Sequence, residues 1–229
     1  MNTVADAIQA IELHQLEVTT KLPIFHCSLN PYPEVLRLAR EAIDDVRQVH
    51  PDSTPSNVRA IYMSPWKSHL ISPKFNPLLD VTAALATRVS REFLQADLAA
   101  LNMVLRPTDC WGVIYEHSDQ TLLHHHFPSD LVAVAYLEAN ENCAPIVFAN
   151  SLVVKPVPGS LVIFPGILLH HVPENFDKRV IVAMNFQKFP NLPNFNPNQV
   201  GSITYRSDLP TTTRPGAPAR PVQRMSWVP

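Results

Sequence analysis

Residues 120–138 of the chain read QTLLHHHFPSDLVAVAYLE, and this stretch gives the clearest indication of the fold. Its second half, 131–138, is a short apolar run containing valine and tyrosine, which is typical of a buried β-strand. Successive side chains of an extended chain point to opposite faces, so His124 and His126 share one face and His125 takes the other. We therefore expect His124 and His126 to point into the protein and His125 to point outward.

Two inward imidazoles are suited to hold a metal ion, because each neutral ring offers one nitrogen lone pair. A third ligand has to come from another part of the chain. The candidates are His170 and His171, which end the apolar stretch after the predicted strand 160–164. Asp130, the first acidic residue after the histidine triplet, is an alternative to His126 if its loop folds back. The two-residue spacing favours His126.

The segment 101–190 around this stretch predicts a β-rich core. Short apolar runs are separated by turn residues at regular spacing, which favours a barrel or sandwich of the jelly-roll type. The predicted strands are 111–115, 131–138, 145–150, 152–157, 160–164 and 179–187.

The segment 1–100 holds the helical signals. Apolar residues recur at helical spacing over 31–50 and again over 78–94. Asn76 is expected to cap the second helix, with Pro77 at its first position. A further short helix is predicted over 5–16, and strands are predicted over 21–29 and 57–63.

The length of 229 residues favours a single domain. We divide it into a helical and strand support region (1–100), a catalytic core (101–190) and a proline-rich tail (191–229), which is expected to be extended. The tail is expected to lie against the same subunit or against a partner in a homodimer.

The bulk composition argues against several classes of partner. The formal net charge of −2 provides no general attraction to nucleic acid or to an anionic membrane. No run approaches the roughly 18 apolar residues of a membrane span, and the N-terminus lacks a signal-peptide pattern, so a cytoplasmic protein is expected. Cys27, Cys110 and Cys143 lack CxxC spacing and are expected to be reduced core thiols.

Arg179 begins the strand 179–187, nine residues after His170. The chain thus has two paired ligands, then a distal histidine and then an arginine. These are the groups that iron(II)/2-oxoglutarate chemistry needs. Three protein ligands on one face of the metal leave positions for the two chelating oxygens of 2-oxoglutarate and for dioxygen. A guanidinium matches the distal carboxylate with two parallel hydrogen bonds, which lysine does less well. The alternative for Arg179 is a surface ion pair with Glu174 or Asp177.

The motifs stand in a defined order: Trp111, HHHFPSDLVAVAYLE, FPGILLHHVPEN, Arg179 and MNF. This order and spacing resemble a family of 2-oxoglutarate/iron(II)-dependent oxygenases with a tryptophan, an H-x-H-P-like element, an FP-x4-H-x-V element and an arginine before FN. Each motif alone is weak, but together they are fairly specific. The resemblance covers the segment from about Trp111 to Phe186 strongly and the helical region only loosely.

The resemblance implies an α+β protein whose core is a double-stranded β-helix (a cupin-like jelly-roll) with flanking N-terminal helices. It assigns His124 and His126 as paired ligands of non-haem iron(II), His170 as the distal ligand, and Arg179 as the clamp on the co-substrate 2-oxoglutarate. It also implies a dioxygenase that hydroxylates a small-molecule or amino-acid-type substrate and releases succinate and CO2. His171 is then only a neighbour of the site.

One departure from the family concerns the middle ligand. Most such oxygenases have Asp or Glu two residues after the first histidine, whereas this chain has His126. An imidazole in place of a carboxylate makes the metal site more positive by one charge, which favours a dianionic co-substrate and changes the electronics of the iron. Asp130 therefore stays an alternative ligand.

Other residues and other functions complete the set of candidates. Trp111 is expected to pack in the core, Tyr115 is a candidate for contact with the co-substrate or substrate, and Asn102 and Asn185 are further polar candidates on strands. The same histidines also suit a zinc hydrolase or hydratase, or a cupin-like protein that binds metal without turnover. Arg179 argues against zinc hydrolysis, which needs no second clamp.

Overall fold

Two helices form where apolar residues recur at helical spacing, in a computed structural model that describes residues 20–192. α2 (Pro33–Val49) begins with proline at its first position and buries one face, formed by Ala39, Ala42, Ile43 and Val46. α3 (Asn76–Glu92) buries a second face, which consists of the apolar residues Leu78, Leu79, Ala86 and Val89 together with Thr82 and Ser90.

Eleven strands of the described residues form two antiparallel sheets. The major sheet has the order β1-β9-β6-β11-β4-β3, with β1 Phe25–Ser28, β9 Ser160–Pro165, β6 Leu131–Glu138, β11 Arg179–Pro190, β4 Met103–Tyr115 and β3 Tyr62–Met63. The minor sheet has the order β2-β5-β10-β7-β8, with β2 Val58–Arg59, β5 Gln120–His124, β10 His170–Val172, β7 Ile146–Phe148 and β8 Leu152–Val154.

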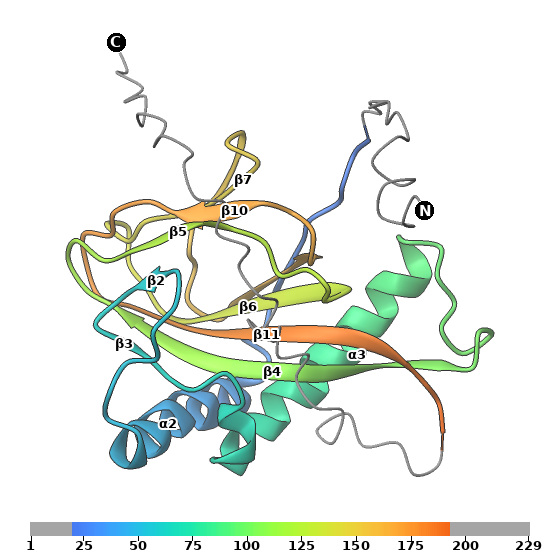
Figure 1. Ribbon diagram of the computed structural model, residues 1–229, viewed down its shortest axis with the longest axis horizontal. Helices are drawn as coiled ribbons and strands as arrows, with labels where there is room; N and C mark the ends of the chain where they lie inside the picture. Colours follow the sequence, from blue (N-terminus) through green and yellow to red (C-terminus); the bar gives the residue numbers. More distant parts are fainter. Residues whose placement is uncertain (1–19, 193–229) are drawn as a thin grey trace, which may run out of the picture. The chain divides into compact units, whose positions relative to one another are not determined.

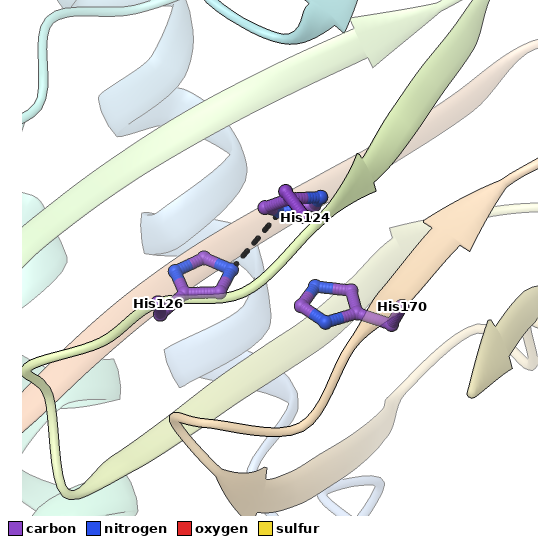
Figure 2. A group of neighbouring side chains, drawn as sticks. All are labelled: His124, His126 and His170. Atoms are coloured by element: carbon purple, nitrogen blue, oxygen red, sulfur yellow. Dashed lines mark hydrogen bonds between the residues drawn. The ribbon is translucent and has the colours of Figure 1, made fainter. Parts of the chain in front are cut away.

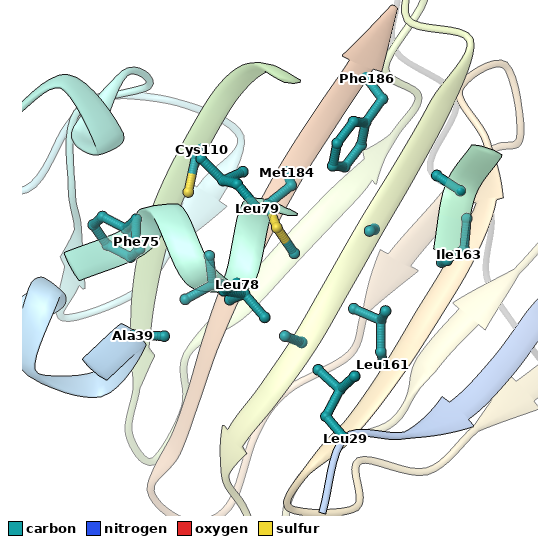
Figure 3. Packing of buried hydrophobic residues seen from close by; sticks show 14 of the residues in the cluster. Leu29, Ala39, Phe75, Leu78, Leu79, Cys110, Leu161, Ile163, Met184 and Phe186 are labelled. Carbon is teal, nitrogen blue, oxygen red and sulfur yellow. The ribbon is translucent and has the colours of Figure 1, made fainter. Parts of the chain in front are cut away.

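The major sheet lies between the two helices and the minor sheet (Figure 1). Its strands are therefore buried on both faces, which is why 131–138 reads as an almost unbroken apolar run. Side chains on one face, such as Cys110, Met184 and Phe186, join the helix-side core (Figure 3). Those on the other face, such as Trp111 and Val134, join the core between the sheets. Burying a large apolar side chain stabilises the fold by about 1.5–3 kcal/mol.

Gly112 allows α2 to pack close against β4. A Cβ atom at this position would lie 2.4 Å from Cγ1 of Ile43, the fully buried isoleucine of α2. The backbone N–H of Gly112 donates to Oγ of Ser64 at 2.8 Å, so β4 is also tied to the loop after β3. The absence of a side chain at Gly112 thus sets the distance between helix and sheet.

Two local predictions need correction. Asn76 is not the cap of α3: the 3-10 turn η2 (Pro73–Phe75) runs directly into the helix, Phe75 stands at the cap position, and no side chain caps the first turn. The predicted strand 57–63 is two short strands, β2 in the minor sheet and β3 in the major sheet, because the chain crosses between the sheets there. A second 3-10 turn, η1 (Ser68–Leu70), follows.

Strands β1, β2 and β3 come from the first hundred residues and pair with β9, β5 and β4, so the support region contributes to both sheets. Cys27, Cys110 and Cys143 are free thiols, as predicted. No helix among residues 20–192 is long and apolar enough to cross a membrane. The predicted helix 5–16 and the proline-rich tail beyond Leu192 lie outside the described residues.

Candidate metal centre

Three histidines from two neighbouring strands and a loop converge between the sheets (Figure 2). His124 is the last residue of β5, and His170 is the first residue of β10. The two are cross-strand partners, so their side chains emerge side by side. His126 lies two residues beyond the end of β5, and one ring nitrogen from each of the three lies within 4.8 Å of the others.

His124 and His126 share the inward direction and His125 is exposed, as the two-residue spacing predicts. The reason is different for His126, however, because this residue has left the strand and the following strand, β6, belongs to the other sheet. The His126 backbone N–H donates to the carbonyl of Gly166 at 2.7 Å, and its own carbonyl accepts from the Ser129 N–H at 2.8 Å. These contacts with the backbone, rather than strand pleating, direct the His126 side chain inward.

The hydrogen bonds of the three rings determine which nitrogen of each is free. Nδ1 of His124 donates to the carbonyl of Leu122 at 2.8 Å, and Nδ1 of His170 donates to the carbonyl of Leu168 at 2.9 Å. A carbonyl only accepts, so Nδ1 carries the proton in both rings. Nδ1 of His126 lies 2.9 Å from the side-chain Oδ1 of Asn185, another acceptor. Each Nε2 is therefore left as a lone pair.

The Nε2 atoms of His124 and His126 lie 3.2 Å apart. With both Nδ1 atoms protonated, two lone pairs face each other at this distance, an arrangement that a shared cation makes favourable. Burial, followed by charge repulsion from neighbouring histidines, lowers the pKa of His126 and of His170 to about 3. Burial also lowers the pKa of His124. The rings are thus neutral at pH 7, which is the form that binds a metal.

Aromatic rings hold the histidines from outside the cluster. Trp111 stacks on His126 with 5.8 Å between ring centroids, and Trp66 packs edge-on against Trp111 at 4.7 Å. Phe164 lies edge-on to His170 at 4.8 Å. Trp111 is 3% exposed, so the prediction of a core role is confirmed, and the same residue also forms part of the wall of the centre.

Arg179 lies in the same interior, where it has no counter-ion among residues 20–192. It is 1% exposed, and its Nη1 donates to the carbonyl of Ala144 at 3.2 Å. Within the same described residues its Nε has no hydrogen-bond partner. Its guanidinium lies over the rings of Tyr115 and Tyr136, at 4.9 and 5.2 Å from their centroids. No carboxylate among residues 20–192 forms an ion pair with it. Because Arg179 is buried, a surface ion pair with Glu174 or Asp177 is excluded.

Tyr115 faces Arg179 across the strand pair β4–β11, where the two residues are register partners. Its hydroxyl lies 2.7 Å from Oγ1 of Thr121 on β5, so it joins the two sheets. Burial raises the pKa of Tyr115, which keeps the phenol neutral and able to donate a hydrogen bond. This places a second polar group beside the unpaired guanidinium.

One cavity connects the histidine cluster with Arg179. Its polar lining consists of the three histidines, Arg179, Tyr115 and Thr121, and the remaining lining residues are Val58, Trp111, Val113, Val134, Ile146, Val172, Ile181 and Ala183. The cavity volume is about 40 Å³, compared with the roughly 10–15 Å³ of such space that a single buried water needs, so the cavity has room for a few water molecules. A larger ligand would therefore have to displace lining side chains as it enters.

Asp130 is not part of the cluster. One carboxylate oxygen pairs with Nζ of Lys188 at 2.9 Å, and the other accepts from the Lys188 backbone N–H at 2.7 Å. The alternative ligand set with Asp130 is thus not the one that the fold assembles.

Asn102 is exposed and precedes β4, so it is not on a strand.

The sequence does not predict that Asp109 belongs to the surroundings of the site. It contacts the histidine cluster through Asn185. Its carboxylate accepts from Nδ2 of Asn185 at 3.1 Å, and Asn185 in turn contacts His126. A signal exists in the sequence: Asp109 precedes Trp111 by two residues on one strand, so both face the same side of the sheet.

Comparisons with known proteins give matches at the level of structure alone. No protein-family model matches the chain, and no curated protein matches it by sequence. The structure of the epimerase SnoN from nogalamycin biosynthesis, described as non-heme and alpha ketoglutarate dependent, is 17% identical and covers 89% of this chain and 90% of its own, with a TM-score of 0.56. A second SnoN structure, in complex with Fe3+, alpha ketoglutarate and nogalamycin RO, is 14% identical over 75% of this chain and 82% of its own, with a TM-score of 0.54.

A prolyl hydroxylase from Trichoplax adhaerens, in complex with a fragment of a hypoxia inducible factor, is also similar. It is 13% identical, covers 78% of this chain and 87% of its own, and has a TM-score of 0.55. At such identities the likeness establishes the fold alone. The chain has the fold of 2-oxoglutarate/iron(II) oxygenases, which confirms at that level the resemblance carried by the sequence motifs.

Proposed function

We propose that the protein is a non-haem iron(II)/2-oxoglutarate-dependent oxygenase, with His124, His126 and His170 as the metal ligands and Arg179 as the co-substrate clamp. The observation that carries this proposal is a buried arginine, without a counter-ion in the described part of the chain, in the same cavity as three imidazoles with free Nε2 atoms. An unpaired buried cation is unfavourable unless an anion joins it. The two sheets would then be those of a double-stranded β-helix.

The donor set fits a divalent first-row metal. Imidazole ligands suit iron, zinc, copper and nickel, and three of them on one face leave open positions. Because all three ligands are neutral, the two positive charges of the metal would not be reduced by the protein. A dianionic chelator would neutralise them, and 2-oxoglutarate has one end for the metal and a second carboxylate for Arg179.

Arg179 and Tyr115 would bind and orient the distal carboxylate. Nε of Arg179 is a donor without a partner among residues 20–192, and Tyr115, whose ring lies under the guanidinium, offers its neutral hydroxyl as a second donor. The apolar lining around them excludes water, which strengthens these charge-assisted hydrogen bonds. The aromatic rings that flank Arg179 hold its guanidinium plane in place.

Iron(II), when bound together with 2-oxoglutarate and dioxygen, would supply the oxidation of the substrate, with succinate and CO2 as the products of the co-substrate. The substrate is proposed to be a small molecule or of the amino-acid type. Similar folds act on very different substrates, since the neighbours include a peptide complex and a nogalamycin complex. The substrate of this chain is therefore assigned only by class.

The rival is a zinc hydrolase or hydratase, because three histidines and an open position are also a catalytic zinc set. The test is anaerobic titration of the iron(II)-loaded protein with 2-oxoglutarate. We expect a weak visible charge-transfer band that saturates with the co-substrate and is absent from the zinc-loaded protein. A protein that retains iron(II) but gives no band and no measurable 2-oxoglutarate binding would overturn the proposal.

A further inference from the structure

His126 is held differently from the other two histidines. Nδ1 of His124 and Nδ1 of His170 each donate to a backbone carbonyl two residues earlier in the chain, so their orientation is set locally. Nδ1 of His126 instead meets the side chain of Asn185, which lies 59 residues further along the chain on β11. His126 is thus the one member of the cluster whose tautomer depends on another side chain.

Asn185 can take only one orientation in this setting. Its Nδ2 lies 3.1 Å from the Asp109 carboxylate, which accepts hydrogen bonds and donates none. A flipped amide would place two acceptor oxygens against each other at that distance. Asp109 therefore holds the amide so that Oδ1 faces His126, and Oδ1 in turn requires the proton of His126 to be on Nδ1. The chain of contacts leaves Nε2 of His126 free, facing the cluster.

The backbone is built to present this pair. Asn185 and Asp109 are register partners on β11 and β4, and the register shifts immediately after them, so that Thr108 is the extra residue of a bulge. Such bulges re-aim side chains beside functional sites. The hydroxyl of Thr108 also donates to the Asp109 carboxylate at 3.1 Å. Asn185 is 8% exposed, so its amide is largely removed from competing water.

We propose that Asp109 and Asn185 are positioning residues for the metal centre, which set the tautomer and the direction of His126 through the contact Asp109–Asn185–His126. The inference rests on the metal site of the proposed function and adds to it. The ligand set has the imidazole of His126 where most such oxygenases have a carboxylate. Here a carboxylate stands two hydrogen bonds behind the imidazole and lends it negative charge.

The test measures the affinity for Co(II) alone, together with the visible spectrum of the bound ion and the thermal unfolding of the metal-free protein. Asn185→Leu keeps the approximate shape and removes the acceptor, and we expect Co(II) affinity to fall by about 10–100-fold with an altered spectrum. Asp109→Ala releases the amide without removing it, and a smaller loss is expected. Met184→Leu, the neighbour of Asn185 on the opposite face of β11, is the matched control and should leave Co(II) affinity unchanged.

The exchange variant Asp109→Asn with Asn185→Asp separates positioning from packing. The new asparagine can donate to the new aspartate, which can accept from Nδ1 of His126, so Co(II) affinity should return to within a few-fold of the unchanged protein. A folded Asn185→Leu variant with unchanged Co(II) affinity and spectrum would overturn the inference, and so would an exchange variant that folds but shows no recovery. Failure of the unchanged protein to bind Co(II) would instead contradict the proposed metal site.

Discussion

The two faces of the major sheet are both buried, but they are closed in different ways. On the helix side, side chains of α3 such as Leu78 pack against side chains of β11 such as Met184 and Phe186, and the groups in contact are hydrocarbon and sulfur (Figure 3). On the other side, the space towards the minor sheet contains three histidines and Arg179 beside apolar residues. The same strands therefore carry a purely structural core on one face and a polar interior on the other.

On the helix side the buried side chains stabilise the fold, whereas between the sheets the fold holds polar side chains in place. Among residues 20–192, the helix side buries the neutral hydroxyl of Thr82 without a hydrogen-bond partner, whereas between the sheets Nε of the charged guanidinium of Arg179 is unpartnered. Leaving a buried polar group unpaired is unfavourable by about 1–3 kcal/mol. A charged donor is the costlier of the two to leave unpaired, so an incoming anion would gain most on the inter-sheet side. Variants on the two faces should therefore fail in different assays.

The largest effect is expected for His170→Ala, which removes one of the three converging Nε2 atoms. Metal affinity should fall by more than about 100-fold, beyond the range known for groups behind a ligand, as measured by competition with a chelator. His171→Ala is the matched control, because it removes the neighbouring ring from the opposite face of β10, and it should retain the metal. The reverse result would show that the ligand is His171 and that the register of β10 is different.

Arg179→Ala should act on the co-substrate and not on the metal. Leaving the distal carboxylate buried and unpaired costs about 2–5 kcal/mol, or a factor of tens to thousands in 2-oxoglutarate affinity. Arg179→Lys should recover part of this loss, since it keeps the charge but not the planar fork. Anaerobic titration of the iron(II) protein measures the 2-oxoglutarate affinity of the unchanged protein and of the two variants. Arg88→Ala, on the exposed surface of α3, is the control. Equal affinities across the set would remove the assigned role of Arg179.

Gly112→Ala is the corresponding change on the helix side. The added methyl group would overlap Ile43 of α2, where 2.4 Å separates the new Cβ from Cγ1. Overpacking of this kind costs about 1–3 kcal/mol of unfolding free energy, which denaturant unfolding measures. Metal affinity of the folded protein should not change. A loss of metal with unaltered stability would show that the two faces are not independent.

The smallest effect is expected for Asp130→Ala. Its carboxylate pairs with Lys188 near the surface, a contact worth less than about 1 kcal/mol in stability. Metal content after purification should equal that of the unchanged protein, because the carboxylate is engaged away from the cluster. Loss of metal in this variant would restore the set of two histidines and one carboxylate that the sequence leaves open.

The sequence predicts much of the site through local periodicity. The two-residue spacing correctly predicts that His124 and His126 point inward and His125 outward, although backbone contacts of the loop rather than strand pleating orient His126. The segment 131–138 is a buried strand as predicted. The choice of His170 over His171 came from the family resemblance and agrees with the cluster that forms. The strands β5 (QTLLH) and β10 (HHV) are not predicted, because neither is an apolar run and the two depend on pairing with each other.

Local periodicity comes from the geometry of the backbone, so the sequence alone predicts the two long helices, the longer buried strands and which of their side chains share a face. Contacts between distant residues depend on sheet register and loop paths, which no local pattern contains. Only the tertiary structure therefore decided that Asp109 and Asn185, which are 76 residues apart, lie behind His126. It likewise decided that Asp130 pairs with Lys188, and that Arg179 is buried beside the histidines with no counter-ion from residues 20–192.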